Sequence, residues 1–255
     1  MKKKFHKGEK VSFVYQGAPY RGVVAGVSGK KRSIRTDTGK KLAIFVELLK
    51  KAKDSVLILE SRLDRSLRSE RIYGEMMAQA LHAYNIDVIY ERVHTRYGFT
   101  RFLKEEINRN KSLRIIHIMS HGRINLKKKT TTLHFTFESL DLDRDAHVFK
   151  DLLEGKILIF SSCEVGNNTE LLKKILKISK AQAIFAYRVE VEDWYTNIVE
   201  FLLYDRIFNT IWSPGKIAER VTSALKTAGI QPEAASSIKR PVLVCVTKNG
   251  VYPRR

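Results

Sequence analysis

The sequence predicts an α/β domain built on a doubly wound, mostly parallel sheet, with a small β-barrel before it. Two observations carry this prediction. Residues 8–50 read as short strands with alternating polarity, separated by Gly, Pro, Asp and Ser turn signals. From Asp54 onward, apolar runs of strand length alternate with segments whose apolar residues recur at helical spacing. We therefore expect two domains, residues 1–50 and residues 54–255.

The first domain resembles an SH3-like module in its expected shape, although it carries no diagnostic motif. Leu48–Lys53 would link it to the second domain. Modules of this shape serve many nucleic-acid and peptide binders. The expected strands are Val11–Tyr15, Tyr20–Ala25, Ser33–Thr36 and Leu42–Val46.

In the second domain, apolar runs bounded by turn residues predict six strands. These are Ser55–Leu59, Ile86–Tyr90, Leu113–Met119, Ile157–Phe160, Gln182–Tyr187 and Pro241–Thr247. Helical spacing fills the intervals between them, and Lys127–Phe137 reads as a hairpin. Residues typical of helix starts and ends, together with helical spacing, predict four helices. These are Asp143–Leu153, which ends before Gly155; a helix that begins at Asn168 or Thr169; Trp194–Phe208; and a helix that begins at Ser213-Pro214 and ends at Gly229.

Composition limits the class of protein. The chain has 255 residues, 44% of them hydrophobic, which is enough for a packed core. No apolar run approaches the roughly 18 residues of a membrane span, and the basic N-terminus has no apolar stretch behind it, so it does not read as a secretory signal. Two cysteines cannot form a disulfide framework, so we expect a reduced, cytoplasmic setting.

The net charge of +20 is large, and the basic segments recur along the chain. Excess Lys and Arg favour a polyanion such as nucleic acid, or an acidic partner protein. A solvated basic surface with no such partner explains the same composition. The sequence leaves both interpretations open.

Two short stretches carry the strongest chemical signal. Ile115–Gly122 is an apolar run that ends in Ser120-His121-Gly122, and Ile157–Gly166 ends in Ser161-Ser162-Cys163. Ligands and chemistry in an open parallel sheet lie at the carboxyl ends of its strands. A Cys and a His delivered to one such edge are the components of a thiolate nucleophile and its acid–base partner.

These two motifs resemble the catalytic dyad of caspase-like cysteine peptidases, a group that includes caspases, metacaspases, separase and bacterial CHAT peptidases. Cys163 follows His121 by 42 residues, which suits the group, and Ser-Ser-Cys-Glu-Val-Gly is closest to the CHAT style. The resemblance implies a three-layer α/β/α sandwich with strand order 2-1-3-4-5-6 and strand six antiparallel. It also implies an oxyanion hole formed by the backbone amides of Gly122 and Cys163, and no cofactor.

The alternative for Cys163 is a buried structural cysteine, which is the role we expect for Cys245 within its apolar strand. Cys163 instead lies among polar residues before a helix, whose N-terminus would lower the pKa of the thiol. His117, inside the apolar run, reads as a packed core residue. Ser120, Ser161 and Ser162 read as structural. His134 and His147 lack ligand spacing, so we predict no zinc site.

The sequence does not decide which P1 side chain the substrate pocket would accept. Arg68 matches best the arginine with which caspases hold an acidic P1 side chain, although it also suits an exposed helix start. Ser161 stands where metacaspases place an aspartate that holds a basic P1 residue. Glu164, Glu192 and Asp193 would select a basic P1 residue instead. Both specificities stay open.

Two functions follow from the sequence. The first is a cysteine endopeptidase that cleaves protein substrates, and the resemblance implies a triggered effector of the kind found in bacterial defence. The second is a basic protein that binds nucleic acid or an activating partner through the N-terminal barrel, with the α/β domain as a non-catalytic scaffold.

Overall fold

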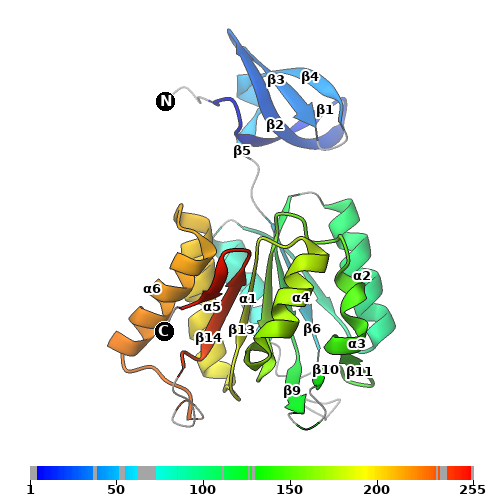
Figure 1. The fold of residues 1–255 in the computed structure, drawn as a ribbon. Coiled ribbons are helices and arrows are strands. Elements are labelled where there is room, and N and C mark those ends of the chain that lie inside the picture. The colour runs from blue at the N-terminus through cyan, green and yellow to red at the C-terminus, as the bar shows by residue number, and fades with distance from the viewer. Residues whose placement is uncertain are drawn as a thin grey trace.

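A computed structural model describes residues 5–36, 39–51, 55–61, 73–84, 86–110, 112–125, 127, 130–233, 235 and 240–253. The chain forms an all-antiparallel sheet up to residue 51 and a mixed α/β region from residue 55 (Figure 1). The expected boundary between two domains stays a prediction, because residues 52–54 lie outside the described ranges.

The first sheet has five strands in the order β4-β3-β2-β1-β5. Its strands are β1 (Lys10–Tyr15), β2 (Ala18–Ser28), β3 (Lys31–Thr36), β4 (Lys41–Phe45) and β5 (Lys50–Lys51). A 3-10 turn over Val46–Leu48 precedes β5. Residues of β3 alternate between exposed and buried, so one face of the sheet covers a small separate core: Phe5, Val11, Phe13, Val24, Ile34, Ile44 and Leu49.

The large sheet has the order β15-β14-β13-β12-β8-β6-β7. Its strands are β6 (Ser55–Glu60), β7 (Asp87–Arg92), β8 (Leu113–Met119), β12 (Ile157–Ser161), β13 (Ala183–Tyr187), β14 (Leu243–Thr247) and β15 (Gly250–Tyr252). Strands β7, β6, β8, β12 and β13 run parallel, and β14 is antiparallel to β13. Counted in chain order, the first six strands lie in the order 2-1-3-4-5-6, which is compatible with a caspase-like fold.

The expected count of six strands was one too low. β15 pairs with β14 through a tight hairpin in which Thr247 faces Gly250. The loop consists of Lys248 and Asn249, and Gly250, the first residue of β15, has a φ of 134°, a conformation that favours glycine.

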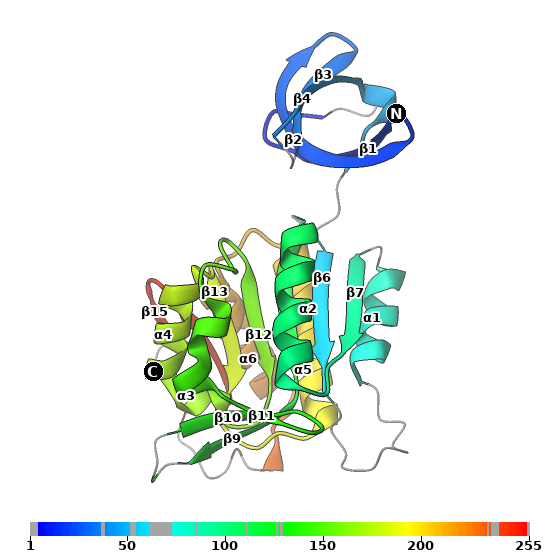
Figure 2. The same ribbon diagram turned by 90° about the vertical axis from the view of Figure 1, so that its right-hand side faces the viewer.

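Helices cover both faces of the large sheet (Figures 1 and 2). Helices α2 (Arg96–Arg109), α3 (Leu142–Asp145) and α4 (Thr169–Ser179) pack on one face, and α1 (Tyr73–Ala83), α5 (Asp193–Asn209) and α6 (Pro214–Thr227) on the other. Strands β6, β12 and β13 are buried along their whole length, which explains their continuous apolar sequence. No helix in the described ranges has both the length and the apolar character needed to cross a bilayer.

The predicted helix caps are confirmed. The side chain of Asn168 accepts a hydrogen bond from the backbone N–H of Leu171 (3.1 Å) and so begins α4. Ser213 caps α6 through the N–H of Lys216 (3.4 Å), with Pro214 at the first helical position. Gly229, with a φ of 69°, follows the end of α6.

Two expectations between residues 121 and 153 were wrong. The hairpin starts earlier than Lys127, because β9 (His121–Asn125) pairs with β10 (Thr130–His134), and β11 (Ser139–Asp141) completes a three-stranded sheet. The expected helix over Asp143–Leu153 is a single α-turn, α3, followed by a 3-10 turn over Ala146–Phe149. That tighter turn brings Ala146, Val148 and Phe149 together into the core, where a continuing α-helix would spread them around its axis.

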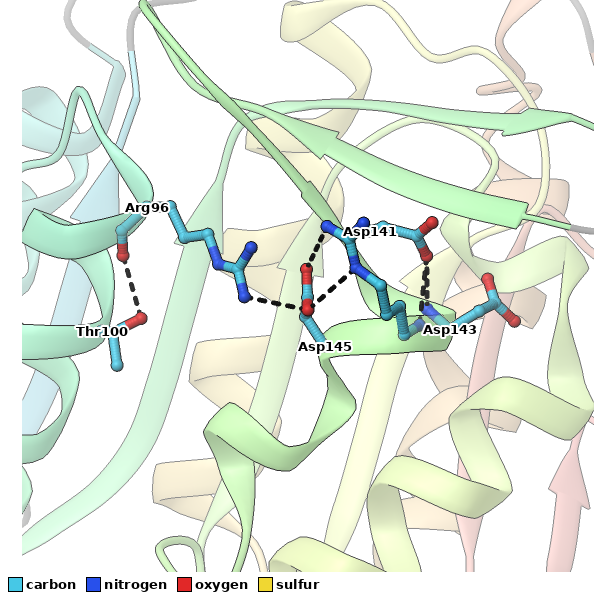
Figure 3. Close-up of polar contacts among 6 residues, drawn as sticks. Arg96, Thr100, Asp141, Asp143 and Asp145 are labelled. Atoms are coloured by element: carbon cyan, nitrogen blue, oxygen red, sulfur yellow. Dashed lines mark hydrogen bonds and ion pairs between the residues drawn. The ribbon is translucent and has the colours of Figure 1, made fainter.

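Asp145 fastens the segment between β11 and the core to helix α2 (Figure 3). Its buried carboxylate pairs with Arg96 on α2 at 2.9 Å and with Arg144 at 3.1 Å. Burial opposes ionisation, but the hydrogen bond from Arg144 and the charge of Arg96 outweigh it, so the pKa of Asp145 lies below its ordinary value.

We expect Asp145→Asn to lower the free energy of unfolding by about 1 kcal/mol, because the arginine partners are 38% and 69% exposed and solvent screens both pairs. The contribution is present above about pH 4, the unfolded pKa, and is lost as the pH falls through the lower folded pKa. Denaturant unfolding at pH 7 and pH 3 measures it. Asp151→Asn, which removes an exposed pair with Lys180 (3.0 Å), is the matched control and should change stability by less than about 0.5 kcal/mol. Equal effects of the two substitutions would contradict the role of Asp145.

Candidate active site

Strands β8 and β12 deliver the two sequence motifs to the same edge of the large sheet. The strands are parallel neighbours, with Met119 opposite Ser161 at their carboxyl ends. Pairing continues one residue further, because the N–H of Ser120 donates to the carbonyl of Ser161 (3.2 Å) and the Ser120 and Ser162 hydroxyls lie 3.1 Å apart. The predicted structural role of these serines therefore includes a direct link between the two motifs.

Gly122 lies directly against the backbone of Cys163. A Cβ atom at Gly122 would collide with the carbonyl oxygen of Cys163 and lie 3.0 Å from the side chains of Ser162 and Val165. Only glycine, which has no Cβ atom, allows the backbone to come this close to Cys163. Close packing therefore requires a glycine at this position. The contact holds the start of β9, where exposed His121 lies, over the turn that carries Cys163.

His121 and Cys163 line one cavity of about 120 Å³. The expected pocket residues Ser161 and Asp193 also line it, whereas Arg68 lies outside the described residues. Four lining residues that lie outside the two motifs were not expected from the sequence. These are Tyr73 at the start of α1, Glu190 and Val191 after β13, and Thr196 on α5.

The thiol of Cys163 makes two hydrogen bonds with the backbone of Val191. The N–H of Val191 donates to Sγ (3.5 Å), and Sγ–H donates to the carbonyl of Val191 (3.7 Å). Cys163 is half-buried and reaches the cavity, whereas Cys245 is fully buried in the middle of β14, as the sequence indicated. The two cysteines therefore differ in access as well as in surroundings.

The expected stabilisation of the Cys163 thiolate by a helix N-terminus was wrong. Burial raises the pKa of the thiol, the Val191 N–H opposes that rise, and the carboxylates of Glu190, Glu164 and Asp193 raise it further. Helix α4 begins only at Thr169, and the intervening 3-10 turn over Val165–Asn167 is a single turn, too short for a helix dipole. Cys163 is therefore protonated near neutral pH in this conformation.

Glu164 faces away from the cavity that holds Cys163. Its carboxylate accepts from the N–H of Ile124 on β9 (3.2 Å), and its own N–H donates to the carbonyl of Val189 (3.1 Å). Its backbone has a φ of 61°, in the left-handed region that non-glycine residues seldom adopt. Glu164 thus links the turn at Cys163 to β9 and to the segment after β13. It is not among the residues that line the pocket.

An acidic groove of about 820 Å³ adjoins the cavity and shares part of its wall. Four carboxylates and two aromatic rings line it: Glu190, Glu192, Asp193, Glu233, Trp194 and Tyr73. Such an accumulation is unusual in a chain of net charge +20. The run Glu190-Val-Glu-Asp193 directly after the fifth parallel strand was the available sequence signal, because that position is the ligand-binding edge. No set of three or more His, Cys, Asp or Glu residues in the described ranges is placed to hold a metal ion.

A buried polar network lies next to the cavity wall. His117 on β8 contacts Glu200 on α5 (3.3 Å) and Tyr204 (2.8 Å), and Tyr187 on β13 donates to Glu200 (3.2 Å). His117 is fully buried, as predicted, but its neighbour Glu200 was not foreseen. Because Glu200 lies one helical turn beyond the cavity residue Thr196, the network fixes α5 against the two strands that end at the site.

Comparisons with known proteins give structural neighbours only. No protein-family model matches the sequence, and no curated protein matches it. The structure of pro-sf-caspase-1 aligns with a TM-score of 0.48 and 12% identity, over 76% of this chain and 87% of that one. A structural-genomics protein from Geobacter sulfurreducens aligns with a TM-score of 0.40 and 13% identity, over 68% of this chain and 89% of that one. The assignment of a caspase-like sheet therefore rests on the strand order.

We expect Gly122→Ala to cost about 1–3 kcal/mol of stability, because the added methyl group must displace the Cys163 carbonyl. Denaturant unfolding measures this cost, and proteolysis of the native protein around residues 121–125 reports any release of β9. Gly26→Ala is the control, since its Cβ would meet only the Ser33 Cβ at 3.7 Å. A Gly122→Ala protein as stable as this control would disprove the close approach.

Neutralising the carboxylates near Cys163 should make its thiol more reactive. In the double variant Glu190→Gln, Asp193→Asn, two charges that disfavour the thiolate disappear, so the pKa of Cys163 falls and the thiolate fraction at pH 7 rises. Iodoacetamide labelling read by peptide mass should then be faster at Cys163 and unchanged at buried Cys245. The distant substitution Glu170→Gln is the control. An unchanged or slower rate at Cys163 would contradict the electrostatic effect.

Proposed function

We propose that the chain is a cysteine endopeptidase that uses Cys163 as nucleophile and His121 as proton donor. One observation carries the proposal: both side chains line a single cavity at the carboxyl edge of a parallel sheet, where chemistry is expected. The dyad motif of the sequence and the compatible strand order agree with it. Neither structural neighbour, at 12% and 13% identity, adds to the argument.

In the proposed reaction, His121 accepts the proton of the Cys163 thiol, and the resulting thiolate adds to the carbonyl carbon of the scissile peptide bond. The backbone N–H groups of Gly122 and Cys163 would donate to the resulting oxyanion. His121 gives a proton to the leaving amine as the C–N bond breaks, which leaves an acyl-enzyme. Water then attacks this thioester, His121 accepts the water proton, and the peptide acid leaves Cys163 free again.

We propose a basic P1 side chain for the substrate. Glu190 and Asp193 line the cavity that holds the thiol, and the adjoining groove adds Glu192 and Glu233. A Lys or Arg side chain would pair with these carboxylates, whereas an Asp side chain would be repelled by them. The acidic alternative depended on Arg68, which lies outside the described residues.

Substrate binding and activation of the nucleophile would then be coupled. The same carboxylates that attract a cationic P1 side chain raise the pKa of Cys163. A bound Lys or Arg offsets their charge and so favours the thiolate. The enzyme would be least reactive without substrate, which fits the regulated effector that the family resemblance implies.

Substrate cleavage tests the proposal. Fluorogenic peptides that vary only at P1 should be cleaved after Arg or Lys, and Cys163→Ala or His121→Ala should lower kcat/KM by on the order of 10³-fold or more. Cys245→Ala is the matched control and should keep activity within about threefold, since that residue is remote from the cavity. Cleavage that survives Cys163→Ala would refute the proposal.

The P1 preference is tested separately in the same assay. Asp193→Asn should lower the ratio of cleavage after Arg to cleavage after an uncharged P1 residue, because it removes a partner of the cationic side chain, whereas the lower pKa of Cys163 favours both reactions equally. Cleavage after Asp that exceeds cleavage after Arg in the unmodified protein would overturn the basic specificity but not the role of Cys163.

A further inference from the structure

The positive charge of the chain is concentrated in its first sheet. Residues 1–51 contain 14 of the 47 Lys and Arg residues but only 3 of the 27 Asp and Glu residues, a net charge of +11 out of +20. More than half of the excess charge thus belongs to about a fifth of the chain. The candidate active site, with its acidic groove, has the opposite character.

Strands β3 and β4 present part of this charge on one surface. Alternation along the strands buries Ile34 and Ile44 and exposes Lys31, Ser33 and Arg35 on β3, with Lys41, Ala43 and Phe45 on β4. We name these six exposed residues the cationic face. Neither strand contains an Asp or Glu residue, so no acidic side chain of β3 or β4 neutralises the face.

The arrangement of the cationic face suits an extended polyanion. Arg35 lies opposite Lys41, and Lys31 lies opposite Phe45, so cations occur at both ends of the paired segment. The two ends are roughly 13 Å apart, at about 3.3 Å per residue. Ser33 lies opposite Ala43 between them, and these small side chains leave room for a backbone to approach.

Phe45 adds a feature that simple charge attraction does not need. Its ring is 42% exposed, although it is a large apolar side chain, and Lys31 Nζ lies 4.6 Å from the ring centroid. An exposed aromatic ring beside cations is the combination with which proteins stack an unpaired base while they hold its phosphates. A duplex offers no free base face to such a ring.

We propose that the cationic face binds single-stranded nucleic acid, with phosphates on Lys31, Arg35 and Lys41 and a base stacked on Phe45. This activity does not involve Cys163 and does not rest on the peptidase proposal. An acidic protein would satisfy the charges but would gain nothing from the exposed ring. DNA and RNA share the chemistry used here, so both belong in the test.

Fluorescence anisotropy of the full-length chain with labelled 20-nucleotide oligo(dT) and oligo(U) tests the proposal. The triple variant Lys31→Ala, Arg35→Ala, Lys41→Ala should bind at least about tenfold more weakly and lower the salt slope, the dependence of log K on log salt, by about two, at roughly 0.7 per lost phosphate contact. The matched control Lys104→Ala, Lys177→Ala, Lys226→Ala removes the same charge from exposed positions of helices α2, α4 and α6 and should bind nearly as well as the unmodified chain. Equal loss in both triple variants would assign the binding to net charge and overturn the proposal.

The stacking interaction is tested by Phe45→Ala and Phe45→Tyr. Alanine should weaken binding of the single strands by about fivefold or more and leave a duplex of the same length unaffected, while tyrosine should restore single-strand binding. Far-UV circular dichroism checks that the sheet persists in each variant. Equal effects on single strand and duplex, or complete displacement of the oligonucleotides by an equal charge of polyglutamate, would overturn the assignment to single-stranded nucleic acid.

Discussion

The parallel register between β8 and β12 is the constraint on which the candidate active site depends. Because Met119 lies opposite Ser161, the His121 and Cys163 segments leave the sheet at the same level and on neighbouring strands. A shift of one residue would turn every side chain of one strand to the other face and separate the two motifs. The apolar face contacts that fix this register are therefore also what brings the reactive groups together. Gly122 completes the arrangement by letting β9 lie on the Cys163 turn.

The groups around Cys163 have opposite effects on the pKa of its thiol. The Val191 N–H favours the thiolate, while burial and the neighbouring carboxylates disfavour it more strongly. Two of these carboxylates, Glu190 after β13 and Asp193 at the start of α5, also line the pocket, and the third, Glu164, follows Cys163 in the chain. In the proposed function, the same few side chains would recognise a cation and restrain the Cys163 thiol. The Glu200–His117 contact secures α5, and with it one wall of the pocket, to the sheet.

Much of this could be predicted from the sequence, and the reasons are local. Long apolar runs marked the buried strands, and the polar residues that directly follow two of them made His121 and Cys163 the candidate site residues. Asn168 and Ser213 are recognisable caps, because their side chains bond to N–H groups only three residues away. The order of the sheet followed from the family resemblance and agrees with the structure.

The features that were missed depend on segments distant in the sequence. Glu190, Thr196 and Tyr73 line the cavity only because three other elements end beside it. The raised pKa of Cys163 follows chiefly from burial, and also from Glu190 and Asp193, which are distant in the sequence; a local motif reveals only the adjacent Glu164. Glu200 lies within a helix that would ordinarily expose a glutamate, and only its contacts with His117 and Tyr187 explain its burial.

A neutral thiol at Cys163 has a consequence for the durability of the protein. Peroxide attacks thiolates, and the products run from a reversible sulfenic acid to irreversible sulfinic and sulfonic acids. A thiol that stays protonated is therefore less susceptible to this oxidation. Burial and the neighbouring carboxylates, which would restrain Cys163 in the proposed reaction, therefore also slow its oxidation.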